Sequence, residues 1–208
     1  MVTQLLEIHA ANPQPRLVSR AVAVVRAGGV VVYPTDSCYA LGCCVGEKAA
    51  MERIRRIRRV GEDHNFTLVC RDLSELASYA RVDNRAYRLL KALTPGPYTF
   101  ILHASREVPR RLQNPRRKTI GLRVPRHPIA QALLDSLGEP LMSSTLLLPG
   151  DDLPLTDAAE IAERLHSQVD LVIDGGYCGL EPTTVLDLTG DIPNVLRHGR
   201  GDVSVLSL

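Results

Sequence analysis

The sequence predicts a single α/β domain, and three observations support this fold class. Short apolar runs typical of buried strands alternate with segments whose apolar residues recur at helical spacing. The elements follow in mixed order, with neither an internal repeat nor a linker long enough to separate two domains. With 208 residues, of which 45% are hydrophobic, the chain can bury a substantial core. We therefore expect one domain over residues 1–208, with its core in about residues 14–202.

The expected elements number eight or nine strands and six helices. Strands are expected over residues 4–9, 29–33, 66–70, 98–103, 119–124, 141–145, 169–173, 183–188 and 194–198. Helices are expected over residues 16–27, 48–59, 73–79, 84–93 and 129–137, followed by one that begins at Thr156 and ends near residue 166. Gly28 and Gly29 favour the end of the first helix, and Thr156 is of the type that caps a helix N-terminus.

The segment from Pro34 to Gly42 follows the strand over 29–33. Pro34 ends that strand because proline cannot donate to a central ladder. Thr35, Asp36 and Ser37 therefore lie just beyond a strand's carboxyl end, where open α/β sheets place their ligands. Three small hydrogen-bonding side chains there indicate a polar small-molecule site, although a turn or helix cap accounts for the same residues.

The helix over 48–59 is rich in arginine. At 100° per residue, Arg58 borders the apolar stripe, so its stem can lie on the core while its guanidinium reaches a pocket. Three other arginines point away from that stripe: Arg55, Arg56 and Arg59. A second basic segment, 109–118, lies between prolines and is expected to be a solvated loop. It carries Arg110, Arg111, Arg116, Arg117 and Lys118.

Composition and motifs exclude several function classes. Neither a P-loop nor a GxGxxG fingerprint occurs, and HExxH and GxSxG are also missing. With two Phe and no Trp, binding of single strands by base stacking is disfavoured. The five cysteines show no metal-binding spacing and are odd in number, so we expect no metal site and a reduced, cytoplasmic protein. We expect no signal peptide and no membrane span.

Hydroxyls or cations recur where the predicted strands end. If these strands are neighbours, the side chains form a pocket that suits a phosphate or carboxylate, because arginine offers a planar fork to either anion. Each residue alone is better explained as a surface arginine or a hydroxyl bonded to backbone, and only the recurrence at strand ends favours a pocket. The set comprises Thr35, Thr119, Arg123, Ser143, Thr145 and Arg197.

Several motifs, in this order, resemble the YrdC/YciO family, and most closely its YciO subgroup. They are residues 28–36, 39–42, 94–97, 123–128, 143–145, 174–176 and 183–188. The resemblance implies a twisted, mixed sheet with a basic concave surface that holds ATP and threonine. It implies an ATP-dependent L-threonylcarbamoyladenylate synthase acting in tRNA modification, with Mg²⁺ accompanying ATP. Thr35, Arg123 and Ser143 match positions that contact threonine. Arg58, Thr119, Thr145 and Arg197 match positions that contact the nucleotide.

Two departures from the synthases predict a weak active site. The Lys-x-Arg pair of the synthases reads Arg58-Arg59-Val60 here, and their Ser-x-Asn reads Thr145-Leu146-Leu147. Each lost electrostatic donor costs about 2–4 kcal/mol of transition-state stabilisation. The alternative is a non-catalytic protein that binds double-stranded RNA or tRNA through the arginines of both basic segments. A solvated charged face accounts for those arginines equally well.

Overall fold

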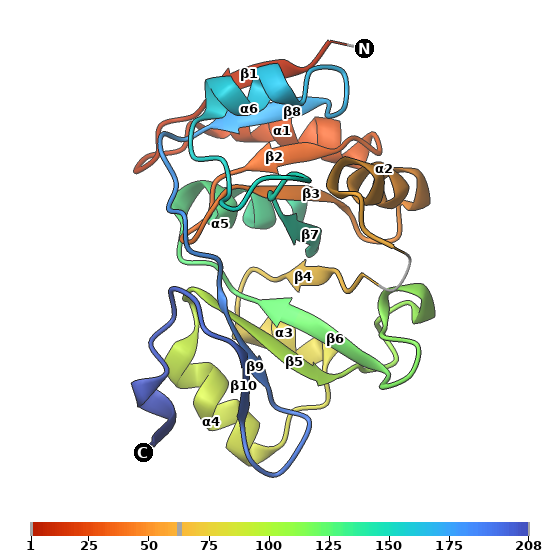
Figure 1. Cartoon of the computed structure of the whole chain (residues 1–208), viewed down its shortest axis with the longest axis vertical. Helices are drawn as coiled ribbons and strands as arrows, with labels where there is room; N and C mark the ends of the chain where they lie inside the picture. Colours follow the sequence, from red (N-terminus) through yellow and green to blue (C-terminus); the bar gives the residue numbers. More distant parts are fainter. Residues whose placement is uncertain (1, 62–63, 208) are drawn as a thin grey trace.

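The computed structural model describes residues 2–61 and 64–207, without the side chains of residues 111, 205 and 207. In this part of the chain, ten strands form one sheet in the order β1-β8-β2-β3-β7-β4-β6-β5-β9-β10 (Figure 1). The strands are β1 (Gln4–Glu7), β2 (Val31–Tyr33), β3 (Ala40–Cys44), β4 (Thr67–Val69), β5 (Tyr98–His103), β6 (Thr119–Arg123), β7 (Leu141–Thr145), β8 (Leu171–Asp174), β9 (Thr184–Asp187) and β10 (Asn194–Arg197). The sheet combines parallel pairs such as β4–β6 with antiparallel pairs such as β4–β7, which confirms the predicted mixed sheet in a single α/β domain.

Six α-helices connect the strands in the described residues. They are α1 (Pro15–Arg26), α2 (Lys48–Arg58), α3 (Leu73–Tyr79), α4 (Asn84–Leu93), α5 (Pro128–Leu137) and α6 (Ala158–Arg164). Two 3₁₀ turns, Arg110–Leu112 and Ser204–Ser207, complete the secondary structure. Gly28 follows α1 with a φ of +81°, and Gly138 ends α5 with a φ of +75°. Glycine adopts this left-handed backbone without the steric cost that other residues bear.

The two faces of the sheet are covered unequally. α1 and α5 pack together over β2, β7 and β8, where Val31, Leu141 and Leu171 belong to one hydrophobic cluster. Helices α2, α3, α4 and α6 contribute to a second and larger cluster on the opposite face. Alternation along β6 places Leu122 in that larger cluster and turns Gly121 and Arg123 the other way. The part of this other face beyond α1 and α5 carries polar side chains instead of a core.

Several element boundaries differ from those predicted. β3 was not predicted, because Ala40, Gly42 and two cysteines give it little strand propensity. The chain has glycine at position 42 for a packing reason, since a Cβ there would lie 2.9 Å from Cε1 of Tyr33. Thr156 does not cap α6. That helix begins after Asp157, whose carboxylate accepts from the Glu160 N–H at 2.9 Å.

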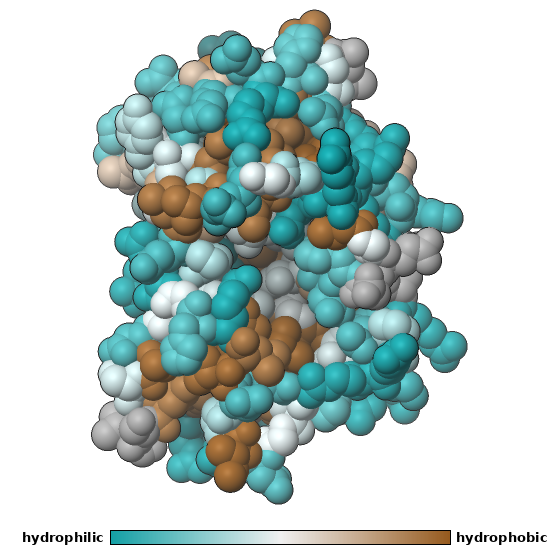
Figure 2. All heavy atoms as spheres, viewed as in Figure 1, coloured by the Kyte–Doolittle hydropathy of each residue, from teal (hydrophilic) through white to brown (hydrophobic). Residues whose placement is uncertain are grey.

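The segment over 109–118 is not wholly a solvated loop. Its 3₁₀ turn, Arg110–Leu112, buries Leu112 in the larger core. Both edge strands of the sheet are short, and Leu196 on β10 is 51% exposed. In Figure 2 the lower half of the molecule shows a hydrophobic area, and the surface is hollowed between the two halves.

Candidate functional site

Arg123, the last residue of β6, is the most strongly bonded cation of the site. It is 7% exposed, and its Nη2 donates to Thr35 Oγ1 at 3.2 Å and to Ser37 Oγ at 3.1 Å. The same nitrogen forms an ion pair with Asp36, whose other oxygen accepts from the backbone N–H of Arg126 at 2.9 Å. We call Thr35, Asp36, Ser37 and Arg123 the Arg123 cluster. The Nε of Arg123 is buried without a hydrogen-bond partner in the described residues.

Ser143 lies beside this cluster and is held in place from β2. The Tyr33 hydroxyl lies 2.8 Å from Ser143 Oγ, which also donates to the Leu41 carbonyl at 3.1 Å. Burial raises the pKa of Tyr33, and the hydrogen bond to Ser143 opposes that shift. The phenol therefore remains neutral, and the orientation of Ser143 is fixed before any ligand binds.

Hydroxyl side chains line a small cavity in front of Arg123. The cavity has a volume of about 30 Å³. Gly121 opens it, because a Cβ on this residue would lie 3.1 Å from Thr67 Oγ1 and 3.5 Å from the Thr99 methyl group. Thr99 Oγ1 and Thr183 Oγ1 are bonded to each other at 2.8 Å. We call these side chains the hydroxyl floor: Thr67, Thr99, Ser143, Thr145 and Thr183.

A larger cavity of about 230 Å³ adjoins the floor at Thr145, which lines both. Arg58 reaches it from the end of α2, with Nη1 donating to Ser144 Oγ at 2.5 Å and Nε to the Leu147 carbonyl at 3.4 Å. Arg197 reaches it from β10 and donates from Nη2 to the Thr183 carbonyl at 2.9 Å. We call this the Arg58–Arg197 cavity.

The three arginines stand close enough to affect one another electrostatically. Partial burial lowers the pKa of Arg58, and Arg197 lowers it further. Partial burial likewise lowers the pKa of Arg197, and Arg123 adds to this shift while the Cys38 thiol opposes it. Among residues 2–61 and 64–207, neither Arg58 nor Arg197 has a carboxylate within salt-bridge distance. Asp152 lines the same cavity, but the two guanidiniums leave a net positive charge that favours an anionic ligand.

The structure brings together all but one of the residues that were predicted to contact a ligand. Thr35, Arg123 and Ser143 meet at the Arg123 cluster, while Arg58, Thr145 and Arg197 line the adjoining cavity. Thr119 was placed at the end of a strand, but it begins β6, four residues before Arg123, and lines neither cavity. It faces the same side of the sheet, because alternate residues of a strand share a face.

The predicted RNA-contacting arginines do not form one free surface. Arg55 was expected to point away from the apolar stripe and to contact RNA. Its side chain is 13% exposed, forms an ion pair with Glu52 and stacks on the Phe66 ring at 5.1 Å. Arg56 and Arg59 line a separate cavity beside α6. In the second segment, Arg110, Arg116, Arg117 and Lys118 are exposed, and Arg117 also pairs with Asp187 at 2.7 Å. The side chain of Arg111 lies outside the described residues.

Several residues of the site were not singled out as ligand contacts. Ser144 and His64 contact Arg58, at 2.5 and 3.4 Å from its Nη1. Thr67, Thr99 and Thr183 join the floor from three further strands or their flanks. Alternation within the strands could have indicated Thr67 and Thr99, but only the strand order shows that they face Arg123.

The described residues contain no group of three His, Cys, Asp or Glu side chains able to hold a metal ion. Asp152 is the acidic side chain that lines the Arg58–Arg197 cavity. A single carboxylate suits a Mg²⁺ ion bound mainly by phosphate oxygens and water. In the same part of the chain, no helix is long and apolar enough to cross a membrane.

Residues 23–199 match the Sua5_yciO_yrdC family, which is described as "Telomere recombination". The uncharacterized protein YciO of Escherichia coli is 60% identical over 202 residues, which cover 97% of this chain and 98% of the relative. The crystal structure of E. coli YciO superposes with a TM-score of 0.93 at 61% identity, over 97% of this chain and 98% of that one.

Other relatives have names or titles that bear on function. A threonylcarbamoyl-AMP synthase of Nitrosococcus oceani is 33% identical over 156 residues, 74% of this chain and 83% of the relative. P. abyssi Sua5, solved in complex with L-threonine, has a TM-score of 0.90 at 26% identity, over 99% of this chain and 60% of that longer one. The chain belongs to the Sua5/YciO/YrdC family.

Proposed function

We propose that this protein is a weak, ATP-dependent L-threonylcarbamoyladenylate synthase or a close functional relative that adenylates a threonine-like molecule for tRNA modification. One observation carries the proposal. Three guanidiniums, those of Arg123, Arg58 and Arg197, converge on a floor of hydroxyls, and only Arg123 is neutralised by a carboxylate. The likeness to a threonylcarbamoyl-AMP synthase and to a threonine-bound Sua5 supports it.

The two ends of the site suit two ligands. The unpartnered Nε of Arg123, with Thr35 and Ser143 nearby, can hold the carboxylate of threonine. Arg58, Thr145 and Arg197 can hold the phosphates of ATP, and Thr119 can bind the nucleotide at the far end of the same face. The cavity at Arg123 has room for about one water molecule. Threonine must therefore displace side chains there or extend into the Arg58–Arg197 cavity.

The reaction requires the protein to neutralise negative charge and to position the substrates. Threonine and bicarbonate form a carbamate with loss of water, and a carbamate oxygen attacks the α-phosphorus of ATP. The bond to the bridging oxygen breaks, and pyrophosphate leaves with that electron pair. Arg58 and Arg197 would stabilise the charge that develops on the phosphates. Mg²⁺ would arrive with ATP, with Asp152 as its protein neighbour in the cavity.

The structure supports a weakened site rather than an intact one. Leu147 lines the Arg58–Arg197 cavity and presents an apolar side chain where the synthases have an amide. Val60 does not line that cavity, and Arg59 lies in the cavity beside α6, so neither residue supplies the second cation. The free thiols of all five cysteines support a cytoplasmic setting.

The test is pyrophosphate release from ATP, measured with and without threonine and bicarbonate at high protein concentration. We expect slow release that requires both co-substrates. Release that is absent, or that does not depend on threonine, would contradict the proposal. A matched control is Arg56→Gln, an exposed arginine on the same helix whose side chain lies outside the site.

A second candidate function is binding of double-stranded RNA or tRNA. It is favoured by the exposed cations Arg110, Arg116 and Lys118 in one segment. Such binding must weaken steeply with salt, because phosphate contacts release counterions. Titration of an RNA duplex at two salt concentrations tests it, and affinity that is absent or indifferent to salt would contradict it.

A further inference from the structure

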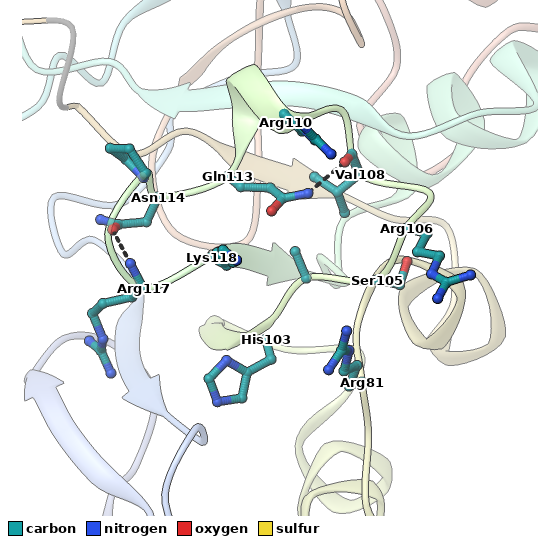
Figure 3. A pocket seen from close by; sticks show the side chains of 12 residues that line it. Arg81, His103, Ser105, Arg106, Val108, Arg110, Gln113, Asn114, Arg117 and Lys118 are labelled. Atoms are coloured by element: carbon teal, nitrogen blue, oxygen red, sulfur yellow. Dashed lines mark hydrogen bonds between the residues drawn. The ribbon is translucent and has the colours of Figure 1, made fainter.

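A further cationic cavity shares no lining residue with the hydroxyl floor or the Arg58–Arg197 cavity. It has a volume of about 940 Å³. We call it the Lys118 cavity, and Figure 3 shows its lining side chains. None of those described side chains is acidic. Its basic residues are Arg81, His103, Arg106, Arg110, Arg117 and Lys118.

Backbone hydrogen bonds hold together the three segments that supply these cations. The Arg81 N–H donates to the His103 carbonyl at 2.8 Å, which ties the chain after α3 to the end of β5. Lys118 has a left-handed backbone with a φ of +53°, and its carbonyl accepts from the Ala104 N–H at 2.9 Å. In Figure 3, Lys118 stands in the middle of the cavity, with Arg110 above it and His103 and Arg81 below.

The positive charge of the Lys118 cavity is not neutralised by acidic side chains among its described lining residues. Arg117 turns to Asp187 and Thr189, at 2.7 and 2.9 Å. The other cations, Arg81, Arg106, Arg110 and Lys118, have no carboxylate within salt-bridge distance in the part of the chain that the structure describes. Like charges gathered in a concavity raise the local concentration of anions. Arginine forks and a lysine ammonium together favour phosphate groups.

We propose that the Lys118 cavity binds the phosphate cluster of a small polyphosphorylated molecule through residues that line neither the hydroxyl floor nor the Arg58–Arg197 cavity. The volume lies in the range of small-molecule pockets. RNA is the other source of clustered phosphates. A protein that binds an RNA duplex, however, contacts the phosphates with cations spread along an extended surface. Arg116 does not line the Lys118 cavity, and Arg117 is paired with Asp187. The remaining cations therefore surround a cavity instead of following an extended surface.

The probe is inorganic tripolyphosphate, titrated into the full-length protein by calorimetry at low salt. Because tripolyphosphate can also enter the Arg58–Arg197 cavity, the titration is repeated in an Arg58→Gln background. We expect binding to persist in that background and to weaken at least about tenfold on adding Arg81→Ala and Arg110→Ala. The control pair Arg16→Ala and Arg20→Ala removes the same charge from exposed positions on α1 and should change affinity by less than about twofold.

Three outcomes would overturn the proposal. Arg58→Gln alone could abolish all tripolyphosphate binding, or the control pair could weaken it as much as the cavity pair does. In the third, tripolyphosphate does not bind, whereas an RNA duplex of about 16 base pairs binds and loses affinity in the cavity pair. Thermal unfolding of each variant checks folding, and the single variant Lys118→Gln, which should weaken tripolyphosphate binding on its own, provides a second test.

Discussion

The Arg123 cluster and the Arg58–Arg197 cavity use the same residue type in opposite ways. Arg123 is buried, paired with Asp36 and bonded to two hydroxyls, so the fold has already compensated most of its charge. Arg58 and Arg197 are partly exposed and are bonded to hydroxyls, backbone carbonyls and, for Arg58, the His64 ring, and burial lowers the pKa of both. The first arrangement mainly holds the chain together and leaves the Nε of Arg123 for a ligand, whereas the second leaves most of its charge available to a ligand.

This difference separates stability from binding within one site. A buried cation that has lost its partner is costly, so changes at the Arg123 cluster should act mainly on folding. An unpaired cation repelled by its neighbours contributes little to folding, so changes at the Arg58–Arg197 cavity should act mainly on ligand affinity. The predictions below test that division.

The largest expected effect is on stability. Arg123→Ala leaves the Asp36 carboxylate, 11% exposed, without its ion-pair partner. We expect a loss of about 3–5 kcal/mol in the free energy of unfolding, measured with urea. Removing both charges, in Arg123→Ala with Asp36→Ala, should cost less than the sum of the two single changes. Simple additivity would mean that the ion pair does not hold this cluster together.

The next effect is on binding. Arg58→Gln should weaken ATP binding by about ten- to a hundredfold, the range for one charge-assisted contact. The same change should alter the free energy of unfolding by less than about 1 kcal/mol, because it also relieves repulsion from Arg197. Calorimetry and urea unfolding measure the two quantities. A large loss of stability with unchanged ATP affinity would reverse the roles that we give to the two regions.

A gain-of-function change tests the Arg58–Arg197 cavity by adding groups instead of removing them. Val60→Arg combined with Leu147→Asn restores the residue types of the synthases. We expect threonine-dependent pyrophosphate release to rise at least about tenfold, since one restored donor contributes more than 1.4 kcal/mol. Little change would indicate that the cavity serves another ligand. Leu147→Ile is a control that keeps the cavity apolar.

The smallest effect concerns pH and the Arg123 cluster. Burial lowers the pKa of His127, Asp36 opposes that shift, and Arg123 adds to it. The unfolded chain therefore binds a proton at His127 more readily than the folded chain does. This group leaves the free energy of unfolding unchanged above about pH 6.5 and lowers it as the pH falls below that value. The slope from this one group stays below about 1.4 kcal/mol per pH unit. In His127→Gln, urea unfolding between pH 7 and pH 5 should show a flatter dependence, and an unchanged slope would contradict this origin.

Local patterns were sufficient to predict much of the fold. The helices α3 and α4 and the strands β5 and β7 have the predicted bounds, because period and capping signals are local. β3 was missed because its sequence gains strand structure only from pairing with β2 and β7. The proximity of Arg58 to Ser144 and of Thr99 to Thr183 depends on strand order, which no local pattern encodes. The contact of Arg55 with the Phe66 ring likewise joins separate elements, whereas its ion pair with Glu52 lies within one helix at an i,i+3 spacing.

The most direct test of the account is a crystal structure of this protein soaked with ATP, Mg²⁺ and threonine. We predict phosphates between the guanidiniums of Arg58 and Arg197, and a carboxylate against Arg123 beside Ser143. Ligands bound elsewhere, with these three arginines unoccupied at saturating concentrations, would contradict the central claim that one hydroxyl-lined hollow holds both substrates.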